Sequence, residues 1–110
     1  MPVPKDKQVL YDIHWLAGII EGEGCFFSGG TSISLYIKMS DEDVIKKAAD
    51  IMGCEYVKAT KNNPKYKDLW SVRVGTMKAV EWMFTLYPLM SSRRKEKIRE
   101  CIKKWIDLRS

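Results

Sequence analysis

The spacing of apolar residues divides the chain into helical and extended segments. Near the N-terminus, Ile13, Leu16, Ala17 and Ile20 fall on one face of a helix, for which Asp12 is the expected N-cap. This pattern predicts an amphipathic first helix with one face in the core.

The opposite face of this helix carries small residues. Gly18 and Gly22 stand four residues apart, a spacing that lets a second helix approach closely. Trp15 and Ile19 flank the same groove. We therefore expect another helix to pack on this face.

Residues 25–39 have the alternation that is typical of strands. They predict two strands joined at Gly29 and Gly30, a common hairpin pair. In the second strand, Ile33, Leu35, Ile37 and Met39 face one way, and Ser32, Ser34, Tyr36 and Lys38 face the other. One face of the predicted sheet is thus apolar and the other polar.

A second helix and a second pair of strands follow. Residues 40–53 predict a helix with Ser40 as N-cap and Gly53 as its end. Residues 54–60 and 68–75 predict strands, separated by a polar turn. The polar side of this pair is expected to carry Tyr56, Lys58 and Thr60 on the third strand, and Leu69, Ser71 and Arg73 on the fourth, alternating with Trp70, Val72 and Val74.

Two helices complete the predicted fold. The first, apolar one runs up to Pro88 and is expected to place Trp82, Met83 and Phe84 in the core. The residues of the last helix expected to face inward are Ile98, Ile102, Trp105 and Ile106. The order αββαββαα predicts an α+β fold in which helices back a four-stranded antiparallel sheet and leave its polar face open. The length suits a single domain over residues 1–110.

Composition narrows the class of protein. Hydrophobic residues make up 45% of the chain, and no apolar run reaches the about 18 residues that span a bilayer. The first residues lack the apolar stretch of a signal peptide. Cys25, Cys54 and Cys101 lack the close spacing of a zinc site, so we expect reduced, mostly buried thiols, and we expect His14 to be structural. These features predict a soluble intracellular protein without a membrane partner.

The excess positive charge lies in one segment. Residues 93–109 contain eight basic and three acidic residues, and this difference of five equals the net charge of the whole chain, +5. Localised positive charge favours a polyanionic partner such as nucleic acid, although a solvated helix face gives the same pattern.

Two helix ends carry charges of the unfavourable sign. Glu21 and Glu23 stand at the C-terminal end of the first helix, where acids are repelled by about 0.3–1 kcal/mol each. Arg93, Arg94 and Lys95 occupy the first turn of the last helix, whose unpaired N–H groups already attract anions. Violations of local rules tend to mark functional sites. Carboxylates and cations on a phosphate-binding surface are the groups that metal-assisted phosphodiester cleavage requires.

Residues 16–24, LAGIIEGEG, closely resemble the LAGLIDADG motif of homing endonucleases, with glutamate in place of both aspartates. The resemblance covers nearly the whole chain: the αββαββα order, Gly53 at the end of the second helix, and residues 87–98, which resemble the family's proline-containing turn before a basic helix. It implies a saddle-shaped sheet on the major groove of double-stranded DNA. With a single motif, it also implies a homodimer and a roughly palindromic target.

The resemblance implies roles for individual residues at the motif. Glu23 is the expected Mg²⁺ ligand, beside the backbone carbonyl of Gly22. Arg93 is expected to stabilise the transition state, with Lys95 in reserve and Lys38 as an alternative that orients the water. The two motif helices of the dimer are expected to pack through Trp15, Gly18, Ile19 and Gly22.

The resemblance also implies a DNA-binding surface. Its candidate base or phosphate contacts are Ser32, Ser34, Tyr36, Lys38, Lys58, Thr60, Ser71, Arg73 and Arg94. Two of these also have a simpler interpretation, because Lys58 and Arg73 can pair with Glu55 or Asp68 at the surface. Glu21 is then the acid of the motif without a catalytic role.

Two functions follow from these expectations. The first is a homodimeric, Mg²⁺-dependent DNA endonuclease, without a small-molecule cofactor, that makes a staggered double-strand cut at a long target; its gene is intron-encoded or free-standing, in a bacterium, a phage-infected cell or an organelle. The alternative is a non-cleaving DNA-binding regulator or RNA-splicing maturase on the same scaffold. Glutamate at position 23 keeps the alternative open, because it is one methylene longer than aspartate and moves a ligand oxygen by about 1 Å.

Overall fold

The computed structural model describes residues 5–59 and 67–109 of the chain. Its elements, in order, are α1 (Lys5–Glu23), β1 (Gly24–Gly29), β2 (Ser32–Met39), α2 (Glu42–Met52), β3 (Tyr56–Lys58), β4 (Trp70–Gly75), α3 (Thr76–Leu86), the 3-10 turn η1 (Tyr87–Leu89) and α4 (Ser92–Arg109). This order confirms the αββαββαα prediction. Predicted contacts at Thr60 lie outside the described residues.

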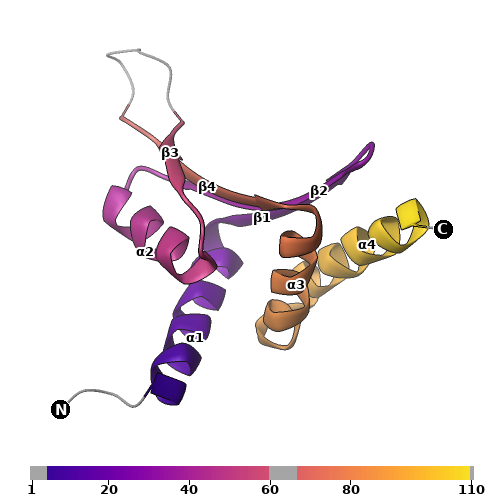
Figure 1. The fold of residues 1–110 in the computed structure, drawn as a ribbon, viewed down its shortest axis with the longest axis horizontal. Helices are drawn as coiled ribbons and strands as arrows, with labels where there is room; N and C mark the ends of the chain where they lie inside the picture. Colours follow the sequence, from indigo (N-terminus) through magenta and orange to yellow (C-terminus); the bar gives the residue numbers. More distant parts are fainter. Residues whose placement is uncertain (1–4, 60–66, 110) are drawn as a thin grey trace.

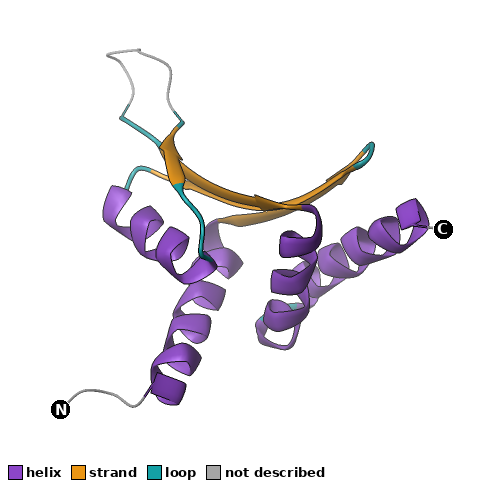
Figure 2. Cartoon of the chain, in the orientation of Figure 1, coloured by secondary structure: helices purple, strands orange, loops and turns teal. Residues whose placement is uncertain are grey.

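The strands form one antiparallel sheet in the order β1-β2-β4-β3. The four α-helices of the described residues lie on one side of this sheet, and none of the described elements covers its other face, which is curved (Figure 1). The same arrangement is visible by element type, with helices beneath the strands (Figure 2). The predicted α+β architecture, an open sheet backed by helices, is therefore confirmed.

The core lies between the sheet and the helices. Phe26, Leu35 and Val74 pair across β1, β2 and β4, and all three are buried. Ile37 and Val72 form the next buried row, and the helices cover these rows with apolar side chains. The buried residues that the helices contribute include Leu16, Ile20, Ile45, Met52, Met83, Leu86, Ile98 and Cys101. The predicted alternation of β2 and β4 is thus confirmed.

The first helix begins earlier than predicted. It starts at Lys5, and Asp12 is an interior residue whose carboxylate accepts a 2.8 Å hydrogen bond from the Gln8 side chain. The segment before Asp12 contains no glycine or proline after Lys5, and Asp6 in the first turn suits the helix dipole. The N-cap prediction for Asp12 was wrong because it used only the apolar face, which begins at Ile13, about two turns after the start of the helix at Lys5.

The start of α2 shifts by one residue from the prediction, and its end does not. In α2 the N-cap is Asp41 rather than Ser40, because the Ile45 amide donates to the Asp41 carbonyl at 3.2 Å and so closes the first helical turn there. The predicted end at Gly53 is confirmed, with φ of 70° in the left-handed region.

The first hairpin turns at Gly30 and Thr31 rather than at Gly29 and Gly30. Gly29 still pairs with Ser32. Of the two turn residues, Gly30 has a positive φ, 56°, and Thr31 does not, as in a type II′ turn. The shift follows from the register that places Phe26 opposite Leu35 in the core.

The third strand has the opposite facing from the one predicted. Tyr56 pairs with Val72 and Lys58 with Trp70, so both lie on the helix-covered side, and Val57 opposite Ser71 lies on the open face. The prediction of a polar side with Lys58 was wrong because Tyr56 is amphipathic: it packs against the core and donates its hydroxyl to Glu42 at 2.8 Å.

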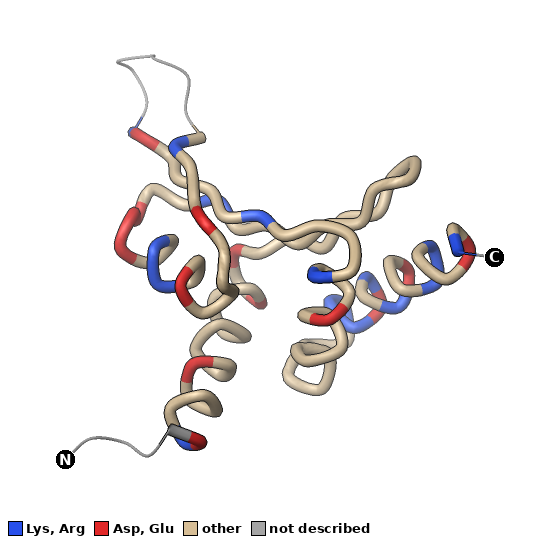
Figure 3. Tube along the Cα trace, in the orientation of Figure 1, with Lys and Arg blue, Asp and Glu red and all other residues tan. Residues whose placement is uncertain are grey.

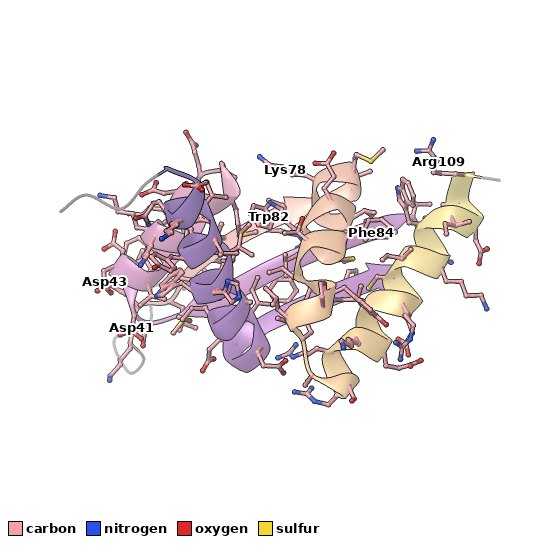
Figure 4. The ribbon with its side chains drawn as sticks, turned by 90° about the horizontal axis from the view of Figure 1, so that it is seen from below. Asp41, Asp43, Lys78, Trp82, Phe84 and Arg109 are labelled. Carbon is pink, nitrogen blue, oxygen red and sulfur yellow. The ribbon has the colours of Figure 1, made fainter. Side chains whose placement is uncertain are left out.

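The last two helices expose some residues that were expected inside. Met83 is buried, and Trp82 is half-buried on the side of α3 that faces α1, whereas Phe84 leaves α3 on the other side and is 59% exposed (Figure 4). In α4, Ile98 is buried, but Ile106 is 55% exposed, and Cys101 takes the second buried position of this helix. Placing Phe84 and Ile106 in the core was wrong because each helix buries only a narrow stripe.

The three cysteines are free thiols, but only Cys101 is buried, while Cys25 and Cys54 are half-buried. Among the described residues, no helix is long and apolar enough to cross a membrane.

Candidate nucleic-acid interface and motif turn

The uncovered face of the sheet carries the residues that alternate with the core positions. Register places on this face Cys25, Phe27, Ser32, Ser34, Tyr36, Lys38, Val57, Ser71 and Arg73. We call this set the open face. Basic positions occur along the strands as well as along α4 (Figure 3). Phe27 and Val57, 40% and 63% exposed, are apolar members of the open face that the sequence analysis did not single out, although the alternation with Phe26 was a signal for Phe27.

Arg73 lies at the centre of a polar network on this face. Its guanidinium donates a 3.0 Å hydrogen bond to the Ser34 hydroxyl and lies 5.7 Å from the centre of the Tyr36 ring. Ser34 is buried under this contact, with 2% exposure. Together with Phe27, Lys38 and Ser71, the Tyr36 and Arg73 side chains line a hollow of about 290 Å³. Arg73 is thus held in place by its neighbours on β2.

Tyr36 is linked to the adjacent strand as well. It pairs with Cys25 of β1, and a hydrogen bond with that thiol raises the pKa of Tyr36. Tyr36 therefore contacts both neighbouring strands, through Cys25 on β1 and Arg73 on β4.

The end of α1 is joined to the start of α4. The Glu21 carboxylate accepts a 2.6 Å hydrogen bond from the Ser91 amide and a 2.8 Å hydrogen bond from the Ser91 hydroxyl. The bond from the Ser91 amide lowers the pKa of Glu21, and the positive charges of Arg94 and Arg93 act in the same direction. Glu21 therefore has a structural role in binding the residue that precedes α4.

Arg94 completes this junction from the α4 side. Its guanidinium donates to the Glu21 carbonyl, at 3.2 Å from Nε and 3.0 Å from Nη2, and to the Gly24 carbonyl, at 2.7 Å from Nη1. The side chain is only 13% exposed. Arg94 therefore points into the protein rather than toward the open face, contrary to the prediction that grouped it with the DNA contacts.

Glu23 is the last residue of α1 and is exposed. The next residue, Gly24, is buried, and a Cβ there would lie 2.8 Å from the Cα of Ile20. This close approach turns the chain from α1 directly into β1. On β2, Ile37 pairs with Gly24, and Lys38 is the residue after Ile37. Lys38 therefore lies on the open face beside the junction between α1 and β1.

The two other predicted basic residues have different surroundings. Arg93 is exposed and lines a hollow of about 480 Å³ with Cys25 and Phe26 of β1 and with Arg94 and Lys97 of α4. Lys95 lies over the Tyr87 ring, at 5.5 Å from its centre. The hollow thus connects Arg93 with the strand that follows Glu23, whereas Lys95 is directed to η1.

The small-residue face of α1 is uncovered in the single chain. Gly18 and Gly22 are exposed, and a Cβ on either would have no atom outside its own helix within 4 Å. Trp15 and Ile19 are half-buried, and the Lys47 ammonium of α2 lies 4.4 Å from the centre of the Trp15 ring. No described residue of this chain packs in the groove between Gly18 and Gly22.

Lys58 forms an ion pair with Asp68, at 3.3 Å, which was the simpler interpretation of this residue. The sequence-based prediction did not include Ser91, the hydrogen-bond partner of Glu21. The available signal was Glu21 itself, an acid at a helix end that lacked an explanation.

The donors at the motif turn are oxygen atoms. Within residues 5–59 and 67–109, no three His, Cys, Asp or Glu side chains are placed to share a metal ion. The carboxylate of Glu23 and the carbonyl of Gly22 match the oxygen ligands that Mg²⁺ prefers, and a full set would need further donors from a second copy, DNA or water.

The fold is shared with solved structures, among them two of the homing endonuclease I-CvuI. One is a complex with the I-CreI target in 2 mM Mg, in which the DNA is not cleaved; it matches with a TM-score of 0.63 and 15% sequence identity. The other is a complex with its own target in 2 mM Ca; it matches with a TM-score of 0.61 and 17% sequence identity. The matches cover 82% and 83% of this chain but 63% and 64% of the solved chains, so the chain spans less than two thirds of their length. No protein-family model and no curated protein matches the sequence.

Proposed function

We propose that this chain is one subunit of a homodimeric, Mg²⁺-dependent DNA endonuclease that makes a staggered double-strand cut at a long, roughly palindromic site. The observation that carries this proposal is Glu23, an exposed acid at the end of α1. It lies between an open polar sheet face and a helix face, Gly18 and Gly22, that no part of the described chain covers.

The open face is the proposed DNA surface. Lys38 and Arg73 supply positive charge there, Ser32, Ser71 and Tyr36 supply hydrogen-bonding groups, and the curvature of the sheet suits a duplex (Figure 1). Arginine reads guanine through two hydrogen bonds in the major groove, so a pre-positioned Arg73 is the strongest candidate for base recognition. Lys58 is left out because it lies on the other side of the sheet.

The exposed groove of α1 is the proposed dimer interface. Two copies that pack through Gly18 and Gly22 around a two-fold axis would bring their Glu23 residues close together, and two-fold symmetry gives two cuts in a palindromic site. The similarity in fold to I-CvuI supports the scaffold.

At the motif turn, Glu23 and the Gly22 carbonyl would hold Mg²⁺, which supplies Lewis-acid stabilisation of charge on the phosphate. Arg93, exposed beside β1, is proposed to stabilise the charge that develops on the phosphoryl oxygens. Lys38, beside the same junction, is proposed to orient the attacking water through hydrogen bonds.

The test is cleavage of a randomised duplex library by the purified protein with Mg²⁺, followed by sequencing of the new ends. Palindromic, staggered ends are expected from the wild type. No new ends are expected from Glu23→Gln or from a metal-free reaction. Glu81→Gln is the matched control, because Glu81 is an exposed acid on α3, away from the open face, and should leave cleavage unchanged.

A second function has one specific observation in its favour, the longer glutamate at position 23 of the motif. A DNA-binding regulator or RNA-splicing maturase would select a nucleic acid and leave no new ends. Selection of duplex DNA without new ends would therefore replace the endonuclease by a DNA-binding protein, and selection of RNA alone would favour the maturase.

A further inference from the structure

Arg94 is a charged residue that faces into the protein between two helices. Of the three basic residues in the first turn of α4, it alone has its guanidinium on main-chain carbonyls at the end of α1. Its neighbour Arg93 is exposed. Burying most of an arginine side chain is costly unless its N–H groups are paired, and the Glu21 and Gly24 carbonyls pair them.

These carbonyls need a cation. The last turn of α1 contains no basic residue and instead contains Glu21 and Glu23, so the negative end of the helix dipole meets acids. Arg94 supplies the missing positive charge from another helix. A planar guanidinium can donate to two carbonyl groups at once, which a lysine ammonium does less well.

The positions of the two carbonyls give this contact its importance. Glu21 and Gly24 bracket Gly22 and Glu23, so Arg94 holds both ends of the turn that carries the acid. Ser91 holds the same turn a second time through the Glu21 carboxylate. The exposed Glu23 therefore stands on a backbone segment that is fixed by the first turn of α4.

We propose that Arg94 is a positioning residue for Glu23 and does not contact DNA. It fixes the turn from Glu21 to Gly24, and thereby the placement of the proposed Mg²⁺ ligands, from inside the protein. This inference rests on the proposed function and names the residue on which the geometry of that site depends. It also separates two adjacent arginines: Arg93 acts on the phosphate and Arg94 on the turn.

The experiment compares Arg94→Gln with Arg93→Gln as its matched control, on the duplex selected from the library. Binding is measured with Ca²⁺ at several salt concentrations, and single-turnover cleavage is measured over a range of Mg²⁺ concentrations. For Arg94→Gln we expect Kd within about two-fold of wild type and an unchanged salt slope, because no phosphate contact is lost. Cleavage should fall by about ten-fold or more, with half-saturation at a higher Mg²⁺ concentration.

Arg93→Gln should behave differently. It removes an exposed cation, so the slope of log K against log salt should decrease by about one. Arg94→Lys should recover only part of the cleavage rate, and Ser91→Ala should change cleavage in the same direction as Arg94→Gln but less. These milder variants also test the inference if Arg94→Gln does not fold.

A readout without DNA completes the design. Amide hydrogen exchange at residues 22–25 should become faster in Arg94→Gln and remain as in wild type in Arg93→Gln, since of these two arginines it is Arg94 that donates to the carbonyls of this turn. Wild-type exchange at these amides, full cleavage at all Mg²⁺ concentrations, or a salt slope reduced as in Arg93→Gln would overturn the inference. If the wild type does not cleave, the proposed function fails, and the exchange measurement still decides whether Arg94 holds the turn.

Discussion

Gly22 and Gly24 stand two residues apart at the end of α1 but have different surroundings. A Cβ on Gly24 would lie 2.8 Å from the Cα of Ile20 and 2.9 Å from its carbonyl oxygen, which are backbone atoms that cannot move aside. A Cβ on Gly22 would meet no atom outside its own helix within 4 Å. The two glycines of one motif therefore serve different purposes: close approach of α1 and β1 at Gly24, and an open helix surface at Gly22.

We predict that Gly24→Ala lowers the free energy of unfolding by about 1–3 kcal/mol, because the added methyl group overpacks against Ile20. Gly22→Ala should leave it unchanged or raise it by up to about 1 kcal/mol, since alanine favours the helix. Urea unfolding at a protein concentration at which the chain is monomeric measures both. Equal effects of the two substitutions would contradict the prediction.

Two adjacent arginines show which property of a side chain the sequence does not reveal. Arg93 and Arg94 are the same residue type in adjacent positions of one helix, so no local pattern distinguishes them. Successive residues of a helix point about 100° apart, and which of them meets another element depends on how the helix lies. Glu23, in contrast, is distinguished by its position in the stretch LAGIIEGEG, and its role as a metal ligand stays a prediction.

At the C-terminal ends of two helices, cations from other elements donate hydrogen bonds to the backbone carbonyls. The last turns of α1 and α2 contain no basic residue. Arg94 of α4 donates to the end of α1, and Lys78 of α3 donates to the Gly53 carbonyl at the end of α2, at 2.9 Å. Each contact offsets the negative end of a helix dipole and ties two elements together.

The pH dependence of stability tests the α1–α4 junction. Because the pKa of Glu21 is lowered in the folded protein, its stabilisation is present above the pKa of an unfolded glutamate, about 4.3, and is lost as the pH falls through the lower folded value. Glu21→Gln should therefore unfold at lower urea than wild type at pH 7, and the difference should shrink below about pH 4.3.

Urea unfolding at a series of pH values checks this expectation. Glu81→Gln, at an exposed position of α3, is the control and should follow the wild-type profile. A difference between Glu21→Gln and wild type that stays constant down to the acid limit would show that the charge of Glu21 does not stabilise the junction.

Within residues 5–59 and 67–109, two surfaces of different character are left uncovered. The open face of the sheet is mainly polar, whereas the exposed side of α1 combines Gly18 and Gly22 with Tyr11, which is 55% exposed. The positive charge of α4 is less available than its count indicated, since Lys97 and Arg99 form ion pairs with Glu100 and Glu96. The open face is therefore a better candidate for the DNA-binding surface than α4 is.

We predict that the wild type sediments as a dimer and that Gly18→Leu sediments as a monomer, because a leucine side chain would fill the groove through which two α1 helices approach. Loss of the dimer should also abolish paired cuts in DNA. Thr85→Leu introduces the same side chain at an exposed position of α3 and should leave the dimer intact. A monomeric wild type, or a dimer that survives Gly18→Leu, would contradict this interface.

The features that could be read from the sequence are those that depend on neighbours in the chain. The order of elements, the two faces of β2 and β4 and the end of α2 at Gly53 follow from periodicity and capping, which act over a few residues. The packing of the elements determines three further features: Arg94 turns inward, Lys58 leaves the open face, and Ser34 is buried beneath Arg73. Each of these depends on contacts between elements far apart in the sequence, such as Glu21 with Ser91, whose free energy is gained only when the helices and the sheet have packed.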